Sequence, residues 1–190
     1  MRLKLKTAPT VEPVTLEEAK LHLKVDSADD NTLITALITT VRQLAERETK
    51  RAFITQIWQM YLDYAPAEIR IPKPPLQSVV AITVLDEDGA ETVVDDTTYD
   101  VDASENSPGR IRLKSGSSWP DHRGFASFII ELKAGYGDAA TDVPEALKQG
   151  LFVLMGHMYE NRGAEGTVKA RVHALEEARI LFAPFKIWTL

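Results

Sequence analysis

Residues 29–64 read DDNTLITALITTVRQLAERETKRAFITQIWQMYLDY, and the change of pattern inside this stretch decides the fold class. Its first part has apolar residues at helical spacing: Leu33, Ile34, Leu37, Ile38, Val41, Leu44 and Ala45. This spacing predicts one long amphipathic helix that begins near Asp29 and Asp30. From Phe53 onward, β-branched and aromatic residues dominate, which predicts a strand over residues 54–64. A helical region therefore gives way to a strand-rich region close to Phe53.

The sequence on both sides of this stretch extends the same division. Upstream, Thr15 and Glu18 have the spacing of a capping box and predict a helix over residues 15–24. Downstream, Asp88-Gly89 predicts the tight turn of a β-hairpin. In a second pair of strands, Asp100 and Asp102 are expected to face Arg110 and Arg112. Further strands are expected over residues 79–85, 91–94, 99–102, 110–113 and 127–134, and further helices from Pro144 and over residues 168–182.

Helices are thus expected at both ends of the chain and strands in its middle. Segregated runs of this kind predict an α+β fold rather than an alternating α/β fold. We expect a helical body of about four helices, contributed by both chain ends, with an inserted antiparallel β domain. The predicted divisions are residues 1–52, 53–135 and 136–190, with the first and last packing as one body.

Composition excludes several classes of protein. The 190 residues are 44% hydrophobic and 26% charged, which is typical of a soluble globular chain. The absence of cysteine excludes disulfides, thiolate zinc sites, iron–sulfur clusters and a cysteine nucleophile. No apolar run approaches the roughly 20 residues of a membrane-spanning helix. These features predict an intracellular soluble protein.

The charge of the chain is concentrated in one segment. The net charge of −6 argues against a general nucleic-acid binder. Residues 74–109 contain nine acids and neither lysine nor arginine. This segment is either a set of solvated turns or an acidic face that lines a channel or meets a partner. The candidates for such a face are Asp86, Glu87, Asp88, Asp95 and Asp96.

No motif for catalysis or metal binding reaches the required number of ligands. His157 and Glu160 are three residues apart on one predicted helix, and a metal site needs more donors than this pair. Asp86 to Gly89 fits a hairpin turn better than a calcium loop, because strands flank it. We therefore predict no catalytic residue, cofactor or metal. A small metal-dependent hydrolase that uses the acidic segment is the alternative from a different class.

Among the last nine residues, four large apolar side chains stand out beside a chain end, where most chains fray. These residues either fold back onto the core or anchor another protein. The four are Phe182, Phe185, Trp188 and Leu190.

Short motifs follow one another in order through nearly the whole chain. They begin with PVTLEEAKLHLKVD at residues 13–26 and continue with Trp119-Pro120 and AGYG at residues 134–137. They close with HMYENR at residues 157–162 and LFAPFK at residues 181–186. In order and spacing they resemble the head–tail connector (adaptor) proteins of tailed phages and prophages, including the adaptors of gene transfer agents.

One position departs from the family's pattern. The family usually has Thr-Gly-Arg after the long helix, whereas this chain has Thr49-Lys50-Arg51. Because the glycine is missing, the long helix is expected to run on further before the first strand.

The resemblance implies a non-enzymatic structural protein. Such proteins form rings, commonly twelve-fold, below the portal, where they extend the DNA channel and dock the stopper or tail. The implied partners are other copies of the chain, the portal, and a stopper or tail-completion protein; DNA passes through without specific binding, and no membrane is involved. The implied location is the virion neck, after assembly in the bacterial cytoplasm.

Family resemblance also bears on the end of the chain. In related adaptors the C-terminal segment engages the portal, which makes Phe182, Phe185, Trp188 and Leu190 the docking candidates. The nearest alternative is another neck or tail-completion protein, a group that tends to be rich in strands and to lack paired flanking helices.

Overall fold

The computed structural model describes residues 1–104, 107–161 and 168–187, with the side chains of the last helix described from His173 onward. Helices and antiparallel sheets together confirm the predicted α+β class. The helices are α1 (Leu16–Leu23), α2 (Asn31–Thr49), α3 (Glu145–Glu160) and α4 (Val168–Phe182). The strands are β1 (Arg2–Thr7), β2 (Gln56–Leu62), β3 (Glu68–Ile71), β4 (Leu76–Leu85), β5 (Glu91–Val93), β6 (Tyr99–Asp102), β7 (Gly109–Leu113) and β8 (Phe128–Ala134).

The chain divides into two compact units. The strand-rich unit comprises Met1–Pro9 and Thr55–Tyr136, and the helical unit comprises Thr10–Ile54 and Gly137–Leu190. The first nine residues belong to the strand-rich unit, because β1 pairs with β2, whereas the predicted division placed them in the helical part.

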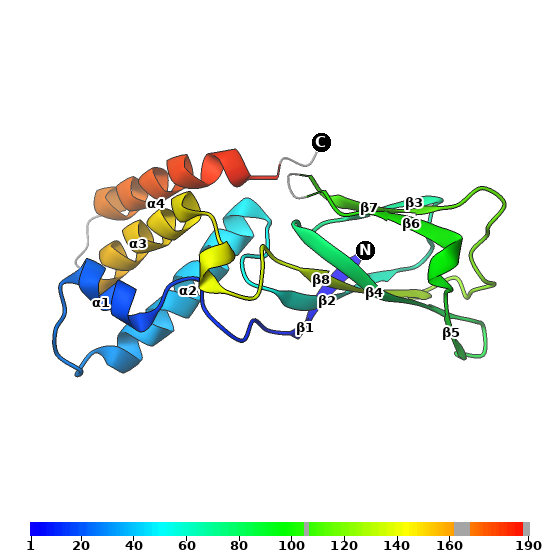
Figure 1. Cartoon of the computed structure of the whole chain (residues 1–190), viewed down its shortest axis with the longest axis horizontal. Coiled ribbons are helices and arrows are strands. Elements are labelled where there is room, and N and C mark those ends of the chain that lie inside the picture. The colour runs from blue at the N-terminus through cyan, green and yellow to red at the C-terminus, as the bar shows by residue number, and fades with distance from the viewer. Residues whose placement is uncertain (105–106, 162–167, 188–190) are drawn as a thin grey trace. The chain divides into compact units, whose positions relative to one another are not determined.

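The strand-rich unit contains two antiparallel sheets that form two layers (Figure 1). The larger sheet has the strand order β1-β2-β8-β4-β5, and the smaller has the order β3-β7-β6. Side chains alternate between the two faces of each strand, so that one face of each sheet is apolar and buried. The core residues include Met60, Ile82, Ile130 and Leu132 from the larger sheet and Ile69, Ile71 and Ile111 from the smaller one.

Two local predictions in this unit are confirmed. The β4–β5 hairpin turns at residues 86–90, and Gly89 adopts a φ of +82°, which glycine reaches without steric cost. On the smaller sheet, Asp102 lies opposite Arg110, and the carboxylate accepts a hydrogen bond of 2.7 Å from the guanidinium. Opposite charges paired in this way help to fix the register of β6 on β7.

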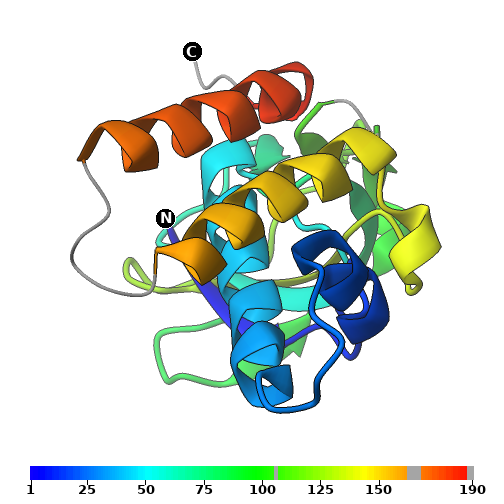
Figure 2. The same ribbon diagram turned by 90° about the vertical axis from the view of Figure 1, so that its left-hand side faces the viewer.

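In the helical unit, α3 and α4 lie side by side, and α2 packs against α3 (Figure 2). The short helix α1 contacts both α2 and α3. The predicted capping box is present, since Thr15 Oγ1 accepts the Glu18 N–H and Glu18 Oε2 accepts the Thr15 N–H. The buried side chains at the helix contacts include Ile34, Ile38, Val41 and Ala45 of α2 and Leu147, Leu151, Leu154 and Met155 of α3.

A buried ion-pair network ties α2 to its neighbours. Arg42 is 5% exposed and Glu46 is 7% exposed, and their side chains are 2.9 Å apart. Arg42 Nε also donates to Glu12 at 2.6 Å, and Glu46 Oε1 accepts the Phe53 N–H at 2.9 Å. Each buried charge therefore has a charged or hydrogen-bonding partner, as burial demands.

The long helix α2 ends at Thr49, so the prediction that it runs on further is wrong. Lys50 takes the left-handed conformation, with φ +61° and ψ +24°, that glycine favours just after the end of a helix. The residues that follow are buried, with Arg51 at 2% and Phe53 at 0% exposure. Packing of these residues holds the chain in a turn that a lysine does not favour on its own.

Candidate assembly surfaces

The side chain of Phe182 is part of the core of the helical unit. It is 2% exposed, and its ring lies so close to Gly150 of α3 that a Cβ there would stand 2.2 Å from Phe182 Cε1. The prediction that Phe182 docks a partner is therefore corrected. Of the two possibilities for the apolar chain end, this residue follows the first and folds back onto the core.

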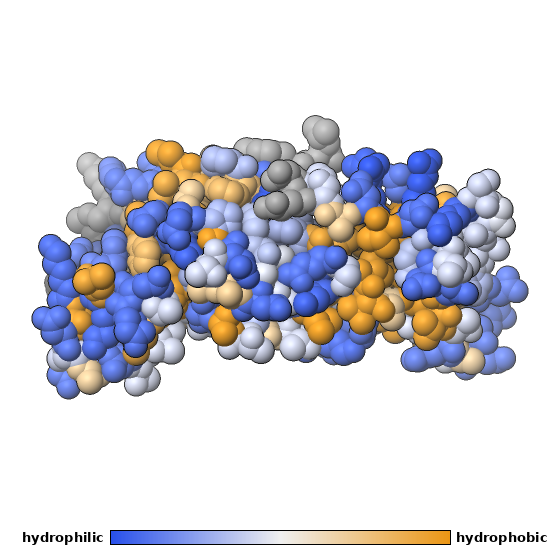
Figure 3. All heavy atoms as spheres, in the orientation of Figure 1, coloured by the Kyte–Doolittle hydropathy of each residue, from blue (hydrophilic) through white to orange (hydrophobic). Residues whose placement is uncertain are grey.

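The exposed side of α4 is also apolar in part. Figure 3 shows hydrophobic surface over this helix, and Leu175 and Ile180 are its exposed large apolar residues in the part described. Ala174, Ala178 and Phe182 form the buried stripe at four-residue spacing. α4 therefore packs through one face and leaves apolar side chains on another.

Residues 185–187 are anchored to the C-terminal end of α2. The Ile187 N–H donates to the Thr49 carbonyl at 3.1 Å, and Arg51 Nε donates to the Phe185 carbonyl. Lys186 Nζ pairs with Glu48 at 2.8 Å. This hydrogen bond from Lys186 is the main reason that the pKa of Glu48 lies below its usual value.

Phe185 and Ile187 both belong to this anchored segment. Phe185 is half-buried, and its carbonyl, not its ring, makes the contact with Arg51. Trp188 and Leu190, the other two predicted docking residues, lie outside the described residues. Phe185 is therefore the one remaining docking candidate that lies in the described part of the chain, and it stands beside the end of α2.

The acidic segment divides into residues that shape turns and residues that face solvent. Asp86 Oδ1 accepts the Ala90 N–H at 2.8 Å and so closes the β4–β5 turn. Asp95 Oδ1 accepts the Thr97 N–H at 2.9 Å, and the two hydrogen bonds from Thr97 lower the pKa of Asp95. These two acids hold local structure.

The other three predicted acids are exposed. Glu87 and Asp88 occupy the tip of the β4–β5 turn, and Asp96 begins the short 3₁₀ helix that follows β5. Within the described part of the chain, no cation forms an ion pair with any of these three carboxylates. These three carboxylates supply the negative field of this surface, whereas Asp86 and Asp95 hold the turns that carry them.

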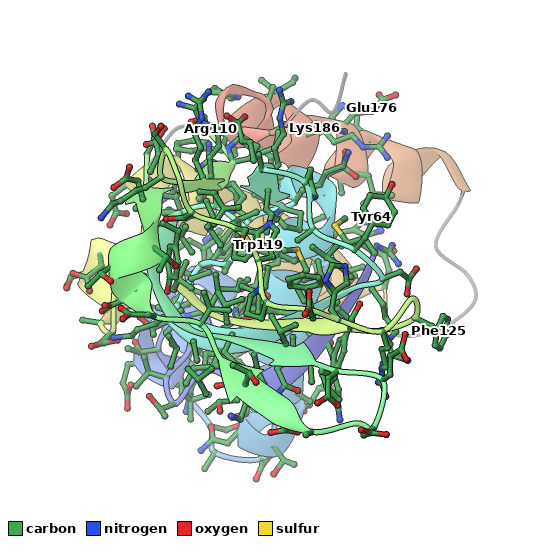
Figure 4. The ribbon with its side chains drawn as sticks, turned by 90° about the vertical axis from the view of Figure 1, so that its right-hand side faces the viewer. Tyr64, Arg110, Trp119, Phe125, Glu176 and Lys186 are labelled. Atoms are coloured by element: carbon green, nitrogen blue, oxygen red, sulfur yellow. The ribbon has the colours of Figure 1, made fainter. Side chains whose placement is uncertain are left out.

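A pair of exposed aromatic residues forms a further surface that the sequence did not reveal. Tyr64 is 73% exposed and Phe125 is 76% exposed, and Figure 4 shows Phe125 projecting from the strand-rich unit. Their loops are joined, since the Ala126 N–H donates to Asp63 at 2.9 Å. Large exposed aromatic groups are typical of protein contacts. Only the turn residues beside them, such as Gly124, marked these loops in the sequence.

The predicted pair of His157 and Glu160 has acidic and imidazole neighbours in the folded chain. His157 and Glu160 line a cleft beside α4 together with His173 and Glu177. Within the described ranges, no group of three or more histidines, aspartates or glutamates is arranged to hold a metal ion. Among the same residues, no helix combines the length and apolar character that crossing a bilayer requires.

Comparison with known proteins defines the class. The chain is a structural protein of phage head–tail connections and not an enzyme. It belongs to the Phage gp6-like head-tail connector protein family, whose model matches residues 13–113, more than half of the 190 residues. No curated protein sequence matches the chain.

Solved structures share the fold over the full length. A chain from the neck of an empty gene transfer agent particle, computed with C6 symmetry, superposes with a TM-score of 0.80 at 23% identity, covering 100% of this chain and 97% of that one. A chain from the native gene transfer agent virion gives 0.76 at 23% identity, with 100% and 98% coverage. A chain from the native neck, computed with C12 symmetry, gives 0.73 at 22% identity, with 100% and 98% coverage. At such identities the similarity establishes the fold.

Proposed function

We propose that this protein is the head–tail connector (adaptor) subunit of a tailed phage, prophage or gene transfer agent. Copies form a ring below the portal, extend the DNA channel and dock the stopper or tail. The observation that carries the proposal is the family match, combined with a fold shared over the whole chain with proteins of gene transfer agent necks. In this account the chain acts in the virion neck after assembly in the host cytoplasm.

The portal contact is assigned to the chain end. Phe185 is half-buried, and its backbone is held by Arg51. A docking residue whose backbone is already fixed loses less conformational entropy on binding than one on a free tail does. Trp188 and Leu190 complete the proposed docking segment, and Phe182 is removed from it because it packs against Gly150.

Channel passage of DNA needs a wall to which DNA does not adhere. Exposed carboxylates such as Glu87, Asp88 and Asp96 repel phosphate, and so does the net charge of −6 on each copy. DNA is therefore proposed to pass without specific binding. The exposed pair Tyr64 and Phe125 is proposed as the surface for the stopper or tail-completion protein.

The mass in solution, measured by light scattering, tests the proposal. The chain is measured alone and then mixed with the portal protein from the same genome. Co-elution with the portal is expected for the intact chain and for Phe125→Ala, and it is expected to be lost on truncation after Ile187. Phe125→Ala is the matched control, because it also removes an exposed aromatic ring. A chain that stays monomeric and ignores its portal contradicts the proposal.

A further inference from the structure

The larger sheet of the strand-rich unit ends in two different edges. β1 lies at one edge and β5 at the other, with β2, β8 and β4 between them. Each edge strand presents backbone N–H and C=O groups that no neighbouring strand pairs, and charged side chains on such edges decide what can approach them.

The two edges carry opposite charges. Arg2 and Lys4 are exposed on β1, and Glu91 is exposed on β5 beside Glu87 and Asp88 of the turn. Directly opposite residues on neighbouring strands lie on the same face of a sheet. The row of opposite residues that starts at Arg2 of β1 ends at Val93 of β5 and passes through Tyr61, Ile129 and Thr83. Alternate residues of β1 and β5 therefore share one outer face. On that face the sheet is basic along one edge and acidic along the other.

The charges at the two edges are not neutralised by ion pairs among the residues that the structure describes. Arg2 lies over the ring of Tyr61, and Lys6, the third cation of β1, pairs with Glu131. Among the described residues, neither Arg2 nor Lys4 forms an ion pair, and neither does Glu91. Four strand spacings of about 4.8 Å separate β1 from β5, so the two edges of one sheet stand about 19 Å apart and cannot neutralise each other.

Charge also limits how two copies can meet. Two β1 edges repel each other, and so do two β5 edges, which disfavours two-fold dimers in which like edges meet. The contact left attractive is that of β1 on one copy with the β4–β5 hairpin of another. Apolar area is available on the acidic side of this contact, since Val93 is 68% exposed on β5.

We infer that a second copy of this chain occupies each edge: the basic β1 edge of one copy contacts the acidic β4–β5 edge of the next. The inference rests on the proposed ring and names the surface through which neighbouring copies meet. A contact between two different surfaces is heterologous, and such contacts close into rings when the rotation between copies permits. The carboxylates of the β4–β5 hairpin then meet a partner, and Asp96, which lies beyond the hairpin, is left to repel DNA.

The contact is made by side chains rather than by one continuous sheet. Neighbouring strands are turned by about 20–25° relative to each other, and this twist accumulates across five strands. A ladder that continued from copy to copy would keep twisting, whereas copies in a ring differ only by rotation about one axis. Ion pairs and apolar contacts between the edges accommodate that rotation.

Cysteine cross-linking tests the surface directly, because the chain has no cysteine of its own. Lys4→Cys and Glu91→Cys chains are mixed at a concentration where rings are seen by light scattering or electron microscopy, and treated with a short bismaleimide. The mixed Lys4→Cys/Glu91→Cys dimer is expected in several-fold excess over either homodimer. Arg70→Cys, an exposed cation on the smaller sheet, is the matched control and is expected to give background cross-linking with Glu91→Cys.

Charge reversal supplies an independent test. The variants R2E/K4E and E87K/E91K are each expected to lose self-association by about tenfold at low salt, because two exposed ion pairs become repulsions. An equal mixture of the two variants is expected to assemble again, with the variants alternating. R70E/R112E changes the charge by the same amount on the smaller sheet and is expected to associate like the unmodified chain.

Rings that form without the mixed cross-link overturn the inference and leave the proposed function standing. Homodimers in equal yield also overturn it, and so does a mixture of charge variants that fails to assemble. Loss of the cross-link on addition of duplex DNA identifies β1 as a DNA site and overturns it as well. If the chain neither forms rings nor binds the portal, the proposed function itself is wrong.

Discussion

The pair formed by Gly150 and Phe182 gives the sharpest prediction about the helical unit. A Cβ at Gly150 would lie 2.2 Å from Phe182 Cε1 and 2.7 Å from Cζ, far inside ordinary contact. Gly150→Ala should gain about 1 kcal/mol from helix propensity and lose about 1–3 kcal/mol to overpacking. In Phe182→Leu, which lacks both of those ring atoms, only the gain remains.

The two substitutions are therefore expected to couple by about 2 kcal/mol. The free energy of unfolding is measured by urea titration, followed by far-UV circular dichroism, for the unmodified chain, the two single variants and the double variant. With a slope of about 2 kcal/mol per M, this coupling corresponds to a shift of about 1 M in the urea midpoint. Distant sites add within about 0.5 kcal/mol. Additivity of Gly150→Ala and Phe182→Leu within that limit would refute the packing of Phe182 against α3, and would return its ring to the set of docking candidates.

Three further predictions concern the rest of the helical unit. Lys50→Gly should raise the free energy of unfolding by about 1 kcal/mol in urea titrations, because glycine takes the left-handed turn without strain, whereas Lys50→Ala should change little. Glu48→Gln should lose stability at neutral pH. Lys186 lowers the pKa of Glu48 in the folded state. The ionised Glu48 side chain therefore stabilises the fold fully above the usual glutamate pKa of about 4.3, and this stabilisation disappears as the pH falls through the lowered pKa. The difference in stability between the two proteins should vanish in acid. Arg42→Met should cost about 3 kcal/mol in the same titration, since it leaves Glu46 buried without its cation, and a loss below about 1 kcal/mol would contradict the network.

Local patterns in the sequence predicted most of the elements, because short-range physics determines them. The capping box of Thr15 and Glu18, the Asp-Gly hairpin, and the pairing of Asp102 with Arg110 all depend on neighbours in the sequence or across one turn. The family resemblance then fixed the class of protein, which the pattern of helices and strands alone does not specify.

Features that depend on distant packing were missed. The alternation of Arg2, Lys4 and Lys6 with leucines is a strand signal, but nothing local indicates that β1 pairs with β2, more than fifty residues away. Position 50 has a lysine instead of the glycine that usually indicates a left-handed residue after a helix. Burial of the residues that follow Lys50 holds its backbone in that conformation. Such long-range contacts also decided which strands form the second sheet.

The candidate surfaces show the same limit. Sequence located the acidic segment and the apolar chain end, but not which residues in each are accessible. Phe182 is buried against Gly150, and the Asp86 carboxylate accepts a hydrogen bond within its own turn. The exposed aromatic pair of Tyr64 and Phe125 became visible only when the loops were brought together.

Electron microscopy of the chain assembled with its own portal tests the central claim most directly. The account predicts a closed ring of this chain coaxial with the portal. Acidic carboxylates on the channel wall or between neighbouring copies would agree with it. Single copies bound away from the portal axis, or particles whose portal vertex carries no ring of this protein, would contradict it.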